Sequence, residues 1–168
     1  MPISVHQASI PVLIRAFDNL TAILEKAETH AAEKKIDLSV FVTARLAPDM
    51  NNLAQQIQRA SDTAKGCAAR LAGIENPSFA DTETTFPDLL ARIAKTVDFL
   101  RTVTEAQLAG AEDRIITLNL GSRTVDFTGA AYLLGFALPN FFFHVTTAYD
   151  ILRHNGVAIG KLDFLGKF

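Results

Sequence analysis

The chain has 168 residues, of which 49% are hydrophobic and 20% charged, so it can form a folded core and general disorder is excluded. Its net charge of −2 offers no basic field, and nucleic acid and membranes are therefore not expected partners. With one cysteine, Cys67, no run of 18 apolar residues and no signal-like N-terminus, we expect a single cytoplasmic domain over residues 1–168.

Apolar residues at helical spacing predict a first helix from about residue 4 to residue 35. Pro11 lies inside this pattern, so the helix either begins near it or kinks there. Residues 36–47 form a connector with room for a short helical turn. The second helix is expected to open at residues 47–49, because a proline suits the first turn and an aspartate favours the positive helix end. It should end at Gly73, and its inward stripe is Met50, Leu53, Ile57, Ala60, Ala64, Cys67 and Leu71.

A polar loop leads to a third helix, for which Thr85 and Asp88 form an approximate capping box. Residues 114–128 then change in character, because two short β-branched runs flank Gly121-Ser122. This pattern predicts a two-residue hairpin, which must lie against the helices to be stable. The apolar seam of the third helix is Phe86, Leu89, Ile93, Val97, Leu100 and Val103.

The fourth helix is expected from about residue 128 to residue 154, with Asn155-Gly156 as its stop and a kink at Pro139. The tail, residues 157–168, is apolar enough to pack back on the helices. Four amphipathic segments, one hairpin and no internal repeat predict an all-α four-helix bundle, with a small β-hairpin between the third and fourth helices. The long connectors leave the order of helix directions open.

Two polar residues interrupt the apolar fourth helix. Asn140 and His144 are four residues apart, so they share a helix face, and the rest of that face is apolar. A buried polar group needs a partner, since leaving it without one costs roughly 1–3 kcal/mol. His144 could therefore be a core residue bonded to Asn140 or to an amide of the second helix, or it could bind an organic ligand or a metal. Asn140 could equally cap carbonyls freed by Pro139.

The segment PNFFFHVTTAYDILRHNG at 139–156, together with APDM at 47–50, resembles the DinB/YfiT-like superfamily of four-helix bundles, and in particular an uncharacterised domain-of-unknown-function branch of it. In that superfamily the terminal helix carries His-x-x-x-His, followed nine residues later by an arginine and then a glycine turn. His144 and Arg153 match this spacing, while Asn140 stands where the first histidine is expected. The resemblance implies a divalent-metal site completed by a histidine of the second helix, and thiol-dependent transferase or hydrolase activity in some members.

This chain departs from the superfamily pattern in its ligands. The second helix, residues 48–72, contains no histidine, and its nearest substitutes are Asp49, Asn52 and Gln56. Amide side chains are poor ligands for zinc or nickel. We therefore expect a degenerate site with no tightly bound metal and no cofactor, any low-affinity divalent ion being held by His144 and Asp49. The predicted ligand-binding residues are His144, Asn140, Gln56, Asn52 and Asp49.

Three functions follow as alternatives: a small-molecule-binding bundle with its pocket between the second and fourth helices, a metal-dependent thiol transferase or hydrolase-like enzyme, and a non-catalytic structural or partner-binding dimer. No catalytic residue can be named. A homodimer is expected because Phe142, Phe143 and Tyr149 lie off the face of Asn140 and His144, and exposed apolar patches of this kind usually mark an interface.

Overall fold

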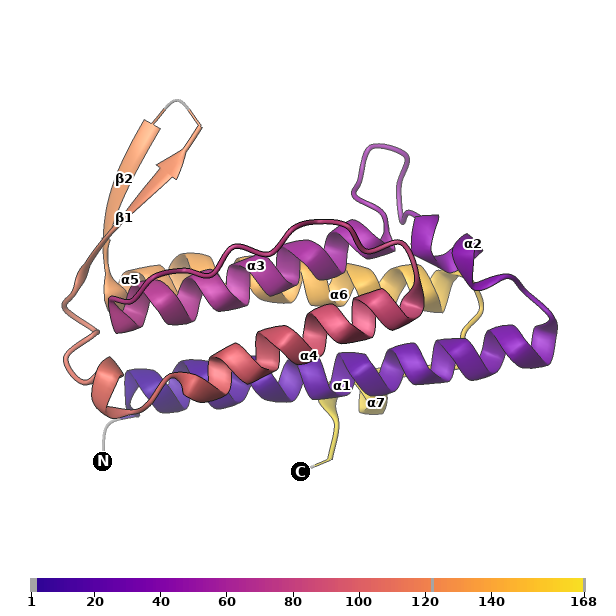
Figure 1. Cartoon of the computed structure of the whole chain (residues 1–168), viewed down its shortest axis with the longest axis horizontal. Helices are drawn as coiled ribbons and strands as arrows, with labels where there is room; N and C mark the ends of the chain where they lie inside the picture. Colours follow the sequence, from indigo (N-terminus) through magenta and orange to yellow (C-terminus); the bar gives the residue numbers. More distant parts are fainter. Residues whose placement is uncertain (1–2, 122, 168) are drawn as a thin grey trace.

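The computed structural model describes residues 3–121 and 123–167 and shows the predicted four-helix bundle with its hairpin (Figure 1). The long helices are α1 (Val5–Lys34), α3 (Leu53–Ala72), α4 (Phe86–Thr102) and α6 (Leu138–His154). The hairpin consists of β1 (Ile115–Leu120) and β2 (Arg123–Thr128). The shorter helical segments are α2 (Leu38–Thr43), η1 (Ala106–Leu108), α5 (Gly129–Tyr132), η2 (Leu133–Ala137) and α7 (Lys161–Leu165).

The long helices do not simply alternate in direction. Figure 1 shows α1 and α6 running one way along the bundle, and α3 and α4 running the other way. Because α3 and α4 are parallel, residues 73–85 must return along the length of the bundle, and Figure 1 shows this segment doing so. The 17 residues of α4 are about 26 Å long, and residues 73–85 in an extended conformation can span this distance. The resulting order is up, down, down, up.

The helix starts are set by side-chain caps. Ser4 and Gln7 form a capping box for α1, which begins at Val5 and continues through Pro11, so of the two alternatives for Pro11 a helix start is excluded. The box of Thr85 and Asp88 at α4 is confirmed.

The predicted start of the second long helix at residues 47–49 is also wrong. Helix α3 begins at Leu53, after Asn52 has accepted a hydrogen bond from the Gln55 backbone N–H at 2.9 Å. Residues 47–50 instead form a turn, in which the Met50 N–H donates to the Ala47 carbonyl at 3.0 Å. An asparagine that can accept from the first helical turn is a stronger start signal than the preceding Pro-Asp pair. Asp49 therefore lies outside the helix, and the half-buried Met50 does not join its inward stripe.

The remaining predicted stripes of α3 and α4 are in the core, where no member is more than 5% exposed. The tail packs against α1 as predicted. Lys26 Nζ lies 2.5 Å from Asp163 Oδ1, and Asn19 Nδ2 donates to the Phe164 carbonyl at 3.0 Å. Within residues 3–121 and 123–167, no helix has both the length and the apolar character needed to cross a membrane.

The hairpin stands at one end of the bundle, beside α5 (Figure 1). Leu120 pairs with Arg123, so its connection has two residues, as predicted: Gly121, with φ +65°, and Ser122, which lies outside the described residues. A Cβ atom at Gly129 would lie only 1.8 Å from the Ala111 carbonyl oxygen, so only glycine allows α5 to begin this close to the strand entry.

Candidate functional site

Three side-chain hydrogen bonds join α3 to the helix formed by α5, η2 and α6, and we call them the polar seam. The α3 partners are spaced seven residues apart, which is about two helical turns, so they share one face of α3. Their partners follow in the reverse order, because α3 and α6 are antiparallel. The three pairs are Gln56 with His144, Thr63 with Asn140, and Arg70 with Tyr132.

A π-helical turn, η2, places Tyr132 on the seam. Pro139 has no N–H to donate to the preceding turn, and the Leu138 N–H donates to the carbonyl of Leu133, five residues back instead of four. In a regular α-helix, Tyr132 would lie about 80° from Asn140 around the axis. The extra residue absorbed by the π-turn reduces this angle to about 20°. The interruption predicted at Pro139 therefore takes the form of a π-turn that aligns the two side chains.

The polar seam fixes the tautomer of His144. Gln56 is 1% exposed, and its Nε2 donates to the Asn51 carbonyl at 3.1 Å, so its Oε1 faces the ring, 2.7 Å from His144 Nδ1. An amide oxygen can only accept, so Nδ1 carries the hydrogen and Nε2 keeps a free lone pair. Burial, and secondarily the charge of Arg59, lower the pKa of His144. The ring is therefore neutral at pH 7.

An open cavity of about 360 Å³ lies along the polar seam. This volume falls at the lower end of the roughly 300–1,000 Å³ typical of ligand pockets. Helix α3 supplies charged and polar groups, and β1 supplies a wall. The aromatic rings come from Phe136 of the π-turn and Tyr132 at the end of α5, which are stacked at 6.0 Å between centroids. The lining residues are Arg59, Asp62, Thr63, Arg70, Thr117, Leu118, Asn119, Tyr132, Phe136, Asn140 and His144.

The structure brings together only part of the predicted ligand set. Gln56 meets His144 directly, and Asn140 and His144 both line the cavity. The Asn140 side chain donates to Thr63 Oγ1 of α3 at 2.9 Å and has no other partner among the described residues, so it caps no carbonyl freed by the proline. Asn52 is engaged as the N-cap of α3, and Asp49 is exposed in the preceding turn; neither lines the cavity. Both precede α3, which begins at Leu53 and not at the predicted residues 47–49, so their role in ligand binding stays a prediction.

The donor set of this site does not fit a tightly held zinc or nickel ion. Within the described ranges, no three His, Cys, Asp or Glu side chains lie close enough to share a metal. The oxygen of Gln56 already accepts from His144, and the carboxylate of Asp62 is bound by Arg92 at 2.9 Å and by Lys65 at 3.2 Å. What is left facing the cavity is one imidazole among amides and hydroxyls, which is a poor site for these metals.

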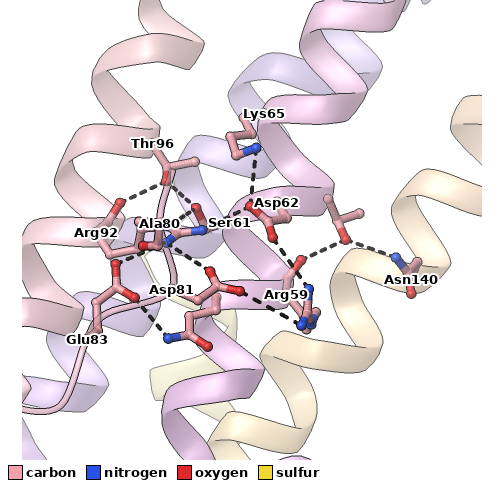
Figure 2. A network of polar contacts seen from close by, with 12 residues as sticks. Arg59, Ser61, Asp62, Lys65, Ala80, Asp81, Glu83, Arg92, Thr96 and Asn140 are labelled. Carbon is pink, nitrogen blue, oxygen red and sulfur yellow. Dashed lines mark hydrogen bonds and ion pairs between the residues drawn. The ribbon is translucent and has the colours of Figure 1, made fainter. Parts of the chain in front are cut away.

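The sequence analysis missed a buried ionic network centred on Arg92 of α4 (Figure 2). The Arg92 side chain is 2% exposed, and each of its three nitrogen atoms has a partner. The network ties the returning segment, residues 73–85, to both parallel helices. The sequence held one indication of this network, because the polar residues Arg92 and Thr96 lie one helical turn apart beside the predicted apolar seam of the third helix. The partners of Arg92 are Ser61 at 2.8 Å, Asp62 at 2.9 Å, Glu83 at 3.0 Å, the Ala80 carbonyl at 3.0 Å and Asp81 at 3.2 Å.

Asp62 connects this network to the cavity. Figure 2 shows Arg92 and Asn140 on opposite sides of α3, with Asp62 and Arg59 between them. Asp62 lines the cavity while its Oδ1 is held by Arg92, and Arg59 lies 3.7 Å from Asp62 and 3.8 Å from Asp81. The charged wall of the cavity is therefore positioned by buried contacts behind it.

The apolar surface of α6 is smaller than the sequence suggests. Phe142 and Tyr149 are half-buried, and the ring of Tyr149 packs edge-on against Phe164 of the tail at 5.9 Å. Phe143 is 55% exposed. The tail thus covers one of the three aromatic residues on which the expected dimer was based, and the homodimer stays a prediction.

Comparison with known proteins places the chain in context. Residues 5–165 match the family described as domain of unknown function (DUF1993). A crystal structure of a DinB family member protein from Shewanella denitrificans is 40% identical, with a TM-score of 0.90, over 98% of this chain and 93% of that one. No curated protein matches the chain.

Proposed function

Because the chain belongs to the DUF1993 family of domains of unknown function and has a DinB-like fold, its activity must be inferred from its site, and we propose that it binds a small organic molecule in the cavity between α3 and α6. The observation that carries this proposal is the oriented, neutral imidazole of His144. Its Nδ1 is fixed by the buried Gln56, which leaves Nε2 free to accept a hydrogen bond in the cavity. A ligand with an O–H or N–H group is the partner that this arrangement suits.

Two features support binding over a purely structural role for His144. The side chain is half-buried and lines a cavity, whereas a residue that only completes the core would be enclosed. The cavity also gathers polar groups from α3, β1 and α6, and convergence of a few polar groups with aromatic rings is typical of ligand sites.

The cavity supports thiol chemistry less well than binding. A general base can be provided by His144 Nε2, but the described residues supply neither a metal site that could activate a substrate thiol nor a protein thiol that could act as nucleophile. The single cysteine, Cys67, is fully buried, and burial raises its pKa to about 12, so its thiol stays protonated and out of reach. Together with the unsuitable metal ligands, this leaves non-covalent recognition as the best-supported function.

The test is a fragment titration followed by nitrogen NMR of the histidine rings. Phenols, amides and hydroxy acids that bind should perturb His144 Nε2 and the Asn140 side-chain amide. His144→Ala should weaken binding about tenfold, which corresponds to one good hydrogen bond. The matched control is His154→Ala, which removes an exposed histidine from the same helix. If no fragment perturbs these groups, or if both variants bind equally well, the cavity is not the binding site.

A further inference from the structure

We propose that the cavity selects a small organic acid, with the carboxylate held by Arg70 and Tyr132 and a hydrogen-bond donor at the other end held by His144. This inference rests on the proposed function, because it names the class of molecule that the same cavity recognises. Three observations support it. One arginine has no acidic partner, one tyrosine hydroxyl has a proton that it does not donate, and the side chains at the two ends of the cavity tilt towards each other.

Arg70 differs from the other arginines near α3 in its partners. Its Nη1 donates to Tyr132 Oη at 3.2 Å, and no carboxylate within the described part of the chain lies within 4.0 Å of it. By contrast, Arg92 is bonded at each nitrogen, and Arg59 lies near both Asp62 and Asp81. A guanidinium has five N–H donors in a planar fork that matches a carboxylate, so Arg70 has donors to offer.

Tyr132 adds a second donor at the same point. Its hydroxyl oxygen accepts from Arg70, which leaves the phenolic proton without an acceptor among residues 3–121 and 123–167. Burial raises the pKa of Tyr132 to about 12, so the hydroxyl stays protonated. An anion placed here meets one cation and one hydroxyl donor, both already oriented by their mutual hydrogen bond.

Gly66 directs Arg70 along the cavity. A Cβ atom at this position would lie 2.4 Å from Arg70 Nη1, so the absence of a side chain lets the guanidinium lie back over α3, one turn towards Thr63. Helical side chains tilt towards the N-terminus of their own helix. Because α3 and α6 are antiparallel, His144 and Arg70 tilt towards each other, which shortens the distance that a ligand must span.

The rest of the cavity restricts the charge and shape of the ligand. Among the described residues that line the cavity, Arg70 is the one cation without acidic neighbours, and the chain as a whole is negative, so a monoanion fits better than a phosphate dianion. Phe136 and Leu118 line the space between the two ends and suit an apolar or aromatic spacer. The expected ligand is therefore an acid and a donor separated by a short apolar group.

The experiment compares three related probes by calorimetry and NMR. The first, 3-(4-hydroxyphenyl)propanoate, has all three features; its primary amide lacks the charge, and 3-phenylpropanoate lacks the donor. The full probe should bind best, and the amide should bind roughly 10- to 100-fold more weakly because a charge-assisted bidentate contact is lost. Without its hydroxyl, 3-phenylpropanoate should no longer shift the signal of His144 Nε2.

Substitutions test where the carboxylate of the probe binds. Arg70→Met should bring the affinity for the full probe down to that for its amide, and Tyr132→Phe should weaken it several-fold while keeping the ring. Arg101→Met, which removes an exposed arginine from α4, is the control and should leave binding unchanged. If the amide binds as well as the acid, or if Arg70→Met has no effect while His144 still responds, the carboxylate assignment is wrong and the proposed function stands. If none of the three probes perturbs the cavity, both fail.

Discussion

Replacing Arg92 with methionine should destabilise the protein by about 3 kcal/mol. The change keeps a long apolar side chain but removes a cation that is 2% exposed and the hydrogen bonds it makes. Removing one partner of a buried ion pair costs roughly 3–5 kcal/mol, because the other charge stays buried without compensation. The lower end applies here, since the side chains of Asp62 and Asp81 are 31% and 35% exposed and can regain water, whereas Glu83 is only 11% exposed.

Urea unfolding followed by circular dichroism measures this loss directly. Arg101→Met is the control, because its ion pair with Asp98 is 60% and 74% exposed and should contribute between 0 and about 1 kcal/mol. Adding Glu83→Gln to Arg92→Met should recover part of the loss by removing the buried carboxylate that has lost its cation. If Arg92→Met costs no more than Arg101→Met, the network does not hold the segment of residues 73–85, and the reasoning fails.

The remaining predictions concern the site and the assembly. His144→Ala should lower the free energy of unfolding by less than about 1 kcal/mol, because water can enter the cavity and replace the ring. Leu152→Ala, in the core, should lower it by about 2–5 kcal/mol. Equal losses in urea unfolding would identify the histidine as a core residue. Folding lowers the pKa of His144, so as the pH falls the unfolded chain takes up a proton on this ring before the folded chain does. The free energy of unfolding should therefore decline below about pH 6.5 and level off below the folded pKa. His144→Ala should remove that part of the decline. Elemental analysis after dialysis against a chelator should find less than one zinc or nickel per chain, and a stoichiometric metal would overturn our reading of the ligands. Sedimentation should show a homodimer that Phe143→Ser weakens, and a wild-type monomer at micromolar concentration would exclude it.

The sequence predicted the architecture well because the apolar periodicity of this chain is strong. The seam from Phe86 to Val103, the capping box at Thr85 and the turn at Gly121 each follow from local rules, and each is found in the structure. The direction of α3 relative to α4 was not predictable from the same rules. It depends on how residues 73–85 pack, and hence on contacts between Arg92 and residues far from it in sequence.

The site was predicted only in part, for a similar physical reason. His144, Asn140 and Gln56 share helix faces that a regular period identifies correctly. Tyr132 was missed because a period of 100° per residue, applied through the π-turn, places it about 80° away from the face of Asn140. Arg70 could have been found, since it continues the seven-residue spacing of Gln56 and Thr63 along α3.

The π-turn has a consequence for chain length that no substitution can reproduce. Deleting one residue between Leu133 and Ala137 would let this segment become a regular α-helix, and because the π-turn holds one residue more than an α-turn, the helix on either side would keep its orientation about the axis. The hairpin, which is attached to this helix through Gly129, would stay on the same side of the bundle, whereas an α-helical turn that kept all five residues would rotate it by about 100° and leave the cavity without the wall that β1 provides. The shape of the binding site thus depends on the number of residues in this turn together with its helix type, and a homologue shorter by one residue here should combine a regular helix with the same opening.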